Sequence, residues 1–172
     1  MSCVVLVVLG VGACSNGTDT SAPDTTALPG VTTLAPLAER YEAATLRVFA
    51  ADGTTREMCV LLAATAETRQ SGLMGVTSLE GYDGMLFRFS PASTGQFWMY
   101  RTLLPLSIAF FDDGVYVSST DMAPCPADDP GACPRYGAAA PYTEALEVTA
   151  GDLGVFGVGP GTRVEVEGPC ER

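Results

Sequence analysis

Residues 95–114 read GQFWMYRTLLPLSIAFFDDG and carry most of the information about the fold. The only tryptophan, Trp98, stands in a short apolar segment, and a longer apolar run follows over 106–111. That run ends at Asp112-Asp113-Gly114, and an Asp-Gly pair between two apolar runs is typical of a β-hairpin. The stretch therefore predicts strands over 96–99 and 106–111, with a hairpin to a third strand over 115–119.

Similar patterns recur along the chain. The sequence Ala51-Asp52-Gly53-Thr54 predicts a turn between strands over 46–50 and 56–62. Thr65 is a suitable N-cap for a helix over 65–72 that ends at a glycine. Further short strands are expected over 84–89, 144–149 and 162–167. Turn sequences about every ten residues predict a mainly β fold, an antiparallel sandwich or barrel with one short helix.

The N-terminal residues predict export and anchoring. An apolar run over 4–11 is too short to span a bilayer, and it leads into Val11-Gly12-Ala13-Cys14. This ending resembles the bacterial lipobox, in which the signal peptide is cut before a cysteine that becomes lipidated. We expect a signal peptide at 1–13, a lipidated Cys14 within a disordered linker at 14–44, and a β domain at 45–172. A plain secretory signal is the alternative.

These features predict a protein of the cell envelope, lipid-anchored to the membrane through Cys14 and facing the extracytoplasmic side. The chain has no histidine, and all nine basic residues are arginines. This composition excludes Ser-His-Asp and Cys-His nucleophiles, His-ligated metals and catalytic lysines, so an enzyme is disfavoured and no catalytic residue, metal or cofactor is assigned. A net charge of −11 argues against nucleic acid as a partner.

Four cysteines lie in the expected β domain, and an even number in an exported domain indicates disulfides. Of the three possible pairings we prefer Cys125–Cys133, which closes a short loop, with Cys59–Cys170, which pins the C-terminus. The scattered methionines admit a second interpretation, a Cu(I) site, although methionines more often fill cores.

Two interpretations of residues 98–102 remain open. In the preferred one, Trp98 and Met99 are strand residues that build a core together with Leu106, Ile108 and Phe110. In the other, the segment is a ligand-binding site, with Arg101 holding an anionic or sugar-like group. The candidate ligand-binding residues are Trp98, Tyr100, Arg101 and Thr102.

Several short motifs occur in a characteristic order, namely Gly72-Leu73-Met74-Gly75, Gly84-Met85-Leu86-Phe87, Phe97-Trp98-Met99, Pro105-Leu106, Cys133-Pro134-Arg135-Tyr136 and Ala145-Leu146-Glu147-Val148. The ordered set resembles the domain-of-unknown-function family 192 over roughly 46–166. The resemblance implies a small, mainly β domain, often exported or lipid-anchored in bacteria, and implies no activity. Ser107 and the pair Tyr100-Arg101 depart from the residues usual in that family.

Three functions follow as hypotheses. The first is a non-enzymatic binding or accessory module for an envelope ligand or protein, with an apolar groove near Trp98 and Arg101 and no strongly perturbed acid. The second is an envelope enzyme that acts on glycan or another anionic polymer, with two facing carboxylates, one of raised pKa. The third is copper handling, with methionine sulfurs converging on an accessible point.

Overall fold

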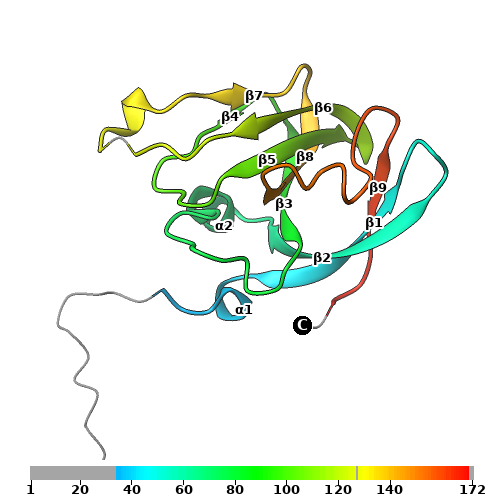
Figure 1. Cartoon of the computed structure of the whole chain (residues 1–172), viewed down its shortest axis with the longest axis horizontal. Helices are drawn as coiled ribbons and strands as arrows, with labels where there is room; N and C mark the ends of the chain where they lie inside the picture. Colours follow the sequence, from blue (N-terminus) through cyan, green and yellow to red (C-terminus); the bar gives the residue numbers. More distant parts are fainter. Residues whose placement is uncertain (1–33, 127, 171–172) are drawn as a thin grey trace, which may run out of the picture. The chain divides into compact units, whose positions relative to one another are not determined.

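Figure 1 shows the computed structural model of the chain, in which residues 34–126 and 128–170 are described. The expected signal peptide, the lipidation site at Cys14 and most of the expected linker lie outside these residues. None of the helices within them is long and apolar enough to cross a bilayer.

Seven strands form a closed barrel in the order β1–β2–β3–β8–β5–β6–β9, and β9 closes it by pairing with both β6 and β1. The mainly β architecture predicted from the turn spacing is therefore confirmed. The strands are β1 (Glu42–Phe49), β2 (Thr55–Ala63), β3 (Gly84–Ser93), β5 (Leu106–Asp112), β6 (Val115–Met122), β8 (Tyr142–Thr149) and β9 (Arg163–Val166).

Both predicted hairpins are present. In the β1–β2 turn, Asp52 accepts hydrogen bonds from the backbone N–H and the hydroxyl of Thr54. In the β5–β6 turn, Asp113 and Gly114 both have positive φ, 47° and 72°, as a two-residue hairpin turn of matching twist requires. Short-range turn chemistry thus sets these two pairings.

One strand pair differs from the antiparallel expectation, because β2 and β3 run parallel. Parallel neighbours need a crossover connection, and the chain between Ala63 and Gly84 supplies it with the helix α2 (Ala66–Ser71). Thr65 caps this helix as predicted, since its side chain accepts from the Thr68 N–H and the Thr68 side chain accepts from the Thr65 N–H. The crossover carries α2 onto the outside of the barrel.

The sheet formed by β2, β3, β8 and β5 is buried on both faces. Leu86, Ala109 and Leu146 belong to a core cluster that receives side chains from all seven strands, so this cluster fills the barrel interior. Their neighbours Phe87 and Phe110 belong to a second cluster on the outer face, which the connecting segments cover. This double burial explains why the run over 106–111 is almost wholly apolar.

The folded region begins earlier than the expected boundary at residue 45. A one-turn helix, α1 (Leu37–Arg40), precedes β1, and Leu37 is only 1% exposed within the outer cluster. The Tyr41 hydroxyl donates a hydrogen bond of 2.6 Å to the carbonyl oxygen of Gly72. The linker assignment is wrong for these residues because a few apolar side chains suffice to dock a segment whose average composition is that of a tether.

Two disulfides join Cys59 to Cys170 and Cys125 to Cys133, the pairing preferred from the sequence. The first ties the C-terminal segment to β2 and the second closes the loop around a 3₁₀ turn, η1 (Pro130–Ala132). Disulfides of this kind persist in oxidising compartments, which indicates an extracytoplasmic location.

Candidate functional site

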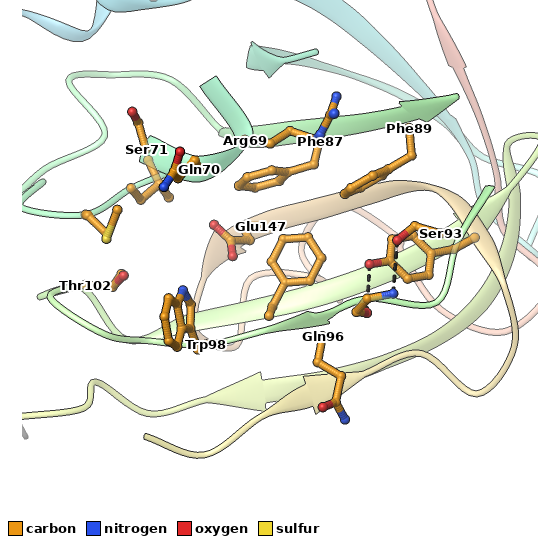
Figure 2. Close-up of a pocket in the computed structure, with 16 residues that line it drawn as sticks. Arg69, Gln70, Ser71, Phe87, Phe89, Ser93, Gln96, Trp98, Thr102 and Glu147 are labelled. Atoms are coloured by element: carbon orange, nitrogen blue, oxygen red, sulfur yellow. Dashed lines mark hydrogen bonds between the residues drawn. The ribbon is translucent and has the colours of Figure 1, made fainter. Parts of the chain in front are cut away.

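A pocket lies on the outer face of the sheet, where β3 and β8 meet the end of α2 (Figure 2). Its remaining wall is the segment containing β4 (Gln96–Phe97) and Trp98; β4 pairs with β7 (Tyr136–Gly137) in a separate two-stranded sheet. The cavity measures ≈ 190 Å³. This is below the range of roughly 300–1,000 Å³ found for drug-sized ligands, so the pocket suits a small ligand or the end group of a larger one.

Aromatic rings make up much of the pocket wall, and they hold one another in place. Phe87 and Phe97 meet edge to face with ring centroids 5.0 Å apart, and Phe89 meets Tyr142 in the same way at 5.2 Å. The Tyr142 hydroxyl donates to the carbonyl oxygen of Gly95, which fixes the β4 segment over the pocket. The aromatic residues of the lining are Phe87, Phe89, Phe97, Trp98 and Tyr142.

The helix α2 contributes Arg69, Gln70 and Ser71 to the lining. The Arg69 guanidinium is held in place by the protein, because its Nη1 donates to the carbonyl oxygens of Ala64 and Arg88 and the group lies 5.0 Å from the centroid of the Phe89 ring. Figure 2 shows its nitrogens turned away from the centre of the pocket. Arg69 therefore fastens α2 to β3 rather than presenting its charge to a ligand.

Glu147 is the acid of the pocket. It lies on β8 opposite Met85 of β3, is 5% exposed, and points among the lining residues in Figure 2. Burial in this largely aromatic surrounding raises the pKa of its carboxyl from 4.5 to about 8. Within the described residues its side chain makes no hydrogen bond and no ion pair. Glu147 is therefore protonated at neutral pH and free to bond with a ligand.

The sequence analysis did not single out Glu147. In the sequence, Glu147 occurs within the motif Ala145-Leu146-Glu147-Val148 of the family resemblance, and on β8 it lies between Leu146 and Val148, whose side chains fill the barrel interior. An alternating strand with a glutamate on its second face normally exposes that face to water. Here the second face is covered by α2 and β4, which are distant in sequence, so the burial of Glu147 follows only from the tertiary structure.

Two of the four predicted ligand-binding residues line the pocket, Trp98 and Thr102. Trp98 follows β4, which is shorter than the strand expected over 96–99, and it is half-buried rather than part of either core cluster. Met99, by contrast, is fully buried, as are Leu106 and Phe110. The core interpretation is thus wrong for Trp98, because Phe97 and Met99 on either side of it pack on the outer core cluster and alternation along the extended chain turns the Trp98 ring to the other side.

Tyr100 and Arg101 lie outside the pocket lining. They continue a row of stacked groups that starts with Arg135, whose guanidinium lies 3.8 Å from the centroid of the Trp98 ring. The Trp98 and Tyr100 ring centroids are 5.8 Å apart, and Arg101 lies 5.1 Å from the centroid of Tyr100. This row braces the outer side of Trp98, so its residues support the pocket wall.

Ser107, which departs from the residue usual in the family, has a structural position. Ser107 is 1% exposed, donates a hydrogen bond to Asp121 and accepts one from the Gly151 N–H. No group of three or more Cys, Asp or Glu side chains in the described part of the chain could hold a metal ion. Four methionines are buried in the cores, namely Met58, Met85, Met99 and Met122, and Met74 alone among the described methionines lines the pocket.

The geometry fits neither of the first two hypotheses in full. A perturbed acid is present, which the binding hypothesis did not expect. Glu147 is nevertheless the one carboxylate among the described pocket residues, whereas glycoside hydrolysis commonly uses a facing pair. The copper hypothesis is not supported, because the buried methionines are divided between the two cores.

Residues 47–166 match the family DUF192, described as "Uncharacterized ACR". A solved structure from Sinorhizobium meliloti 1021, provisionally named a transcription regulator, is similar with a TM-score of 0.63 at 30% identity, over 73% of this chain and 95% of that one. A solved structure of a protein of unknown function from Novosphingobium aromaticivorans DSM 12444 is similar with a TM-score of 0.62 at 29% identity, over 72% of this chain and 84% of that one. No curated protein matches. The family match spans nearly the whole barrel, and the chain belongs to the domain-of-unknown-function family 192.

Proposed function

We propose that this protein is a binding module of the cell envelope, which holds a small ligand, or the end group of a larger one, in the pocket around Glu147. The observation that carries the proposal is the Glu147 carboxyl, which belongs to a side chain only 5% exposed, makes no hydrogen bond or ion pair with the described residues, and is directed into an aromatic cavity. Leaving such a group unpaired costs stability, and a ligand that hydrogen-bonds to it would recover that cost. Aromatic faces beside one polar group are also the usual makeup of small-molecule sites.

The test uses Trp98, which lines the pocket and is the only tryptophan of the chain. The full chain is screened against small amines, alcohols, carboxylates, monosaccharides and cell-wall fragments, with Trp98 fluorescence and thermal shift as readouts. A true ligand changes both, and Glu147→Gln weakens its binding while Glu165→Gln, which removes an exposed glutamate of β9, does not. Absence of any saturable response at millimolar concentrations would contradict the proposal.

An enzyme that acts on glycan is the second candidate, because a carboxyl that is protonated at neutral pH can serve as a general acid. Hydrolysis of cell-wall glycan that is lost in Glu147→Gln would favour it over binding alone. Transcriptional regulation, the provisional role of the Sinorhizobium relative, is not proposed, because a net charge of −11 opposes contact with DNA phosphates.

The location proposed for the module is the outer side of the cytoplasmic membrane or a further envelope membrane, with the anchor at Cys14. The lipobox-like Val11-Gly12-Ala13-Cys14 supports it, together with the two disulfides. Cys14→Ser is expected to release the protein from the membrane fraction. Membrane retention of that variant would contradict the anchor while leaving the pocket proposal unaffected.

A further inference from the structure

The pocket combines a carboxyl group with aromatic faces, and among the described residues of its lining no basic group is directed at that carboxyl. Arg69 is the one arginine of the lining, and its guanidinium is held by backbone carbonyls and by the Phe89 ring. Arg135 stacks on Trp98 but is not part of the lining. The site thus lacks the positive counter-charge that most buried carboxylates have.

We infer that the pocket binds an organic ammonium group, whose positive charge pairs with Glu147 and packs against the rings of Phe87 and Trp98. The inference rests on the proposed function and names the class of its ligand. Figure 2 shows the carboxyl turned into the space between these two rings. Aromatic faces attract cations electrostatically, and the attraction is stronger where water is excluded.

The charge balance supports a cation over the other ligand classes. An anion would meet no free guanidinium inside the pocket and would be repelled once Glu147 loses its proton. A neutral ligand could bond with protonated Glu147, but it would leave the ionised form unpaired. A cation supplies the missing counter-charge itself, and the net charge of −11 favours its approach.

Binding of the cation is coupled to release of one proton from Glu147 to the solvent. The charged and titratable groups around Glu147 are Arg69 on α2, Tyr41 ahead of β1 and Tyr142 on β8. Burial raises the pKa of Tyr41 and of Tyr142 from 10, so neither tyrosine changes charge between pH 6 and pH 9. The affinity for a cation of fixed charge should therefore follow the ionisation of Glu147 alone.

The experiment titrates the full chain with choline and with 3,3-dimethylbutan-1-ol, its uncharged isostere, using Trp98 fluorescence at pH 6 and pH 9. Choline keeps its charge at both values. With a pKa of about 8, Glu147 is about a hundredfold less ionised at pH 6, so choline should bind at least tenfold more weakly there. At pH 9 choline should bind at least tenfold more tightly than the alcohol.

Glu147→Gln should remove both differences, whereas Glu165→Gln, which removes an exposed acid of β9, should keep them. Thermal melting verifies that each variant is folded. Equal affinities for choline and the alcohol in the unmodified protein would overturn the ammonium inference while leaving a small-ligand pocket in place. No response to choline at millimolar concentration would overturn it as well, and the broader screen then decides the proposed function separately.

Discussion

Replacing Glu147 by glutamine should stabilise the barrel at neutral pH, and the gain should grow as the pH rises. Below pH 4.5 the Glu147 carboxyl carries its proton in both the folded and the unfolded chain. Between pH 4.5 and about 8 the unfolded chain releases that proton, while the folded chain keeps it because burial raises its pKa. The unfolded state therefore binds fewer protons in this window, and the free energy of unfolding falls as the pH rises.

The magnitude follows from this difference of one proton. The free energy of unfolding should fall by about 1.4 kcal/mol for each pH unit within the window. By pH 7 the accumulated loss is roughly 3 kcal/mol, a large part of the 5–15 kcal/mol that typically stabilises a domain. A glutamine side chain cannot ionise, so in the Glu147→Gln variant this position should cause no such decline in the free energy of unfolding.

The assay is urea unfolding of the full chain, followed by Trp98 fluorescence at pH 5.5, 6.5 and 7.5. The chain has no histidine, which is the side chain that ordinarily titrates in this range, so little else should contribute to the slope. Near Glu147, burial raises the pKa values of Tyr41 and Tyr142 from 10, so neither tyrosine titrates in this range. The experiment thus isolates one group.

Glu165→Gln is the control, because it removes an exposed glutamate and should leave the slope unchanged. Stability of the unmodified protein that is flat between pH 5.5 and 7.5 would refute the argument. So would an equal decline in Glu147→Gln, because the slope would then belong to another group.

Three further variants test other features of the fold, and the free energy of unfolding of each is measured with urea. Thr65→Ala removes the hydroxyl that caps α2 and should lower the free energy of unfolding by about 1 kcal/mol. An unchanged free energy of unfolding would mean that the cap does not stabilise the fold. Gly84→Ala places a Cβ against the Glu147 carbonyl oxygen and should cost roughly 1–3 kcal/mol or more; unchanged stability would contradict this close strand approach. Replacing both Cys59 and Cys170 by alanine removes a cross-link between residues 111 positions apart and should lower the free energy of unfolding by roughly 4 kcal/mol. A loss under 1 kcal/mol would argue against that disulfide as a major stabilising feature.

The elements that could be predicted from the sequence are those whose cause is local. The hairpin at Asp113-Gly114 depends on two positive φ values, and the start of α2 depends on the hydroxyl of Thr65. Both are decided within four residues of the chain. The strand over 106–111 could also be predicted, because a strand buried on both faces is apolar along almost its whole length.

The remainder depends on contacts between segments far apart in sequence. The parallel pairing of β2 with β3 is a property of the whole crossover, and no short motif encodes it. Leu37 looks like part of a tether until the outer cluster that receives it is known. Glu147 looks like a solvated strand residue until α2 and β4 are seen to cover it. Trp98, one of the predicted ligand-binding residues, lines the pocket and belongs to neither core cluster, and this position depends on the distant segments that form the pocket.

Glu147 joins the stability and the function of this domain in a way that can be tested. Its carboxyl makes no hydrogen bond or ion pair within the described fold, and the raised pKa predicts that it lowers stability near neutral pH, so the barrel itself should gain nothing from this carboxyl. Groups that are costly to the fold concentrate at binding and catalytic sites. If the carboxyl serves a ligand, then a single substitution, Glu147→Gln, must both raise stability and abolish the preference for choline over its uncharged isostere. A variant that gains stability without losing any binding would instead mark Glu147 as a packing defect of the outer core.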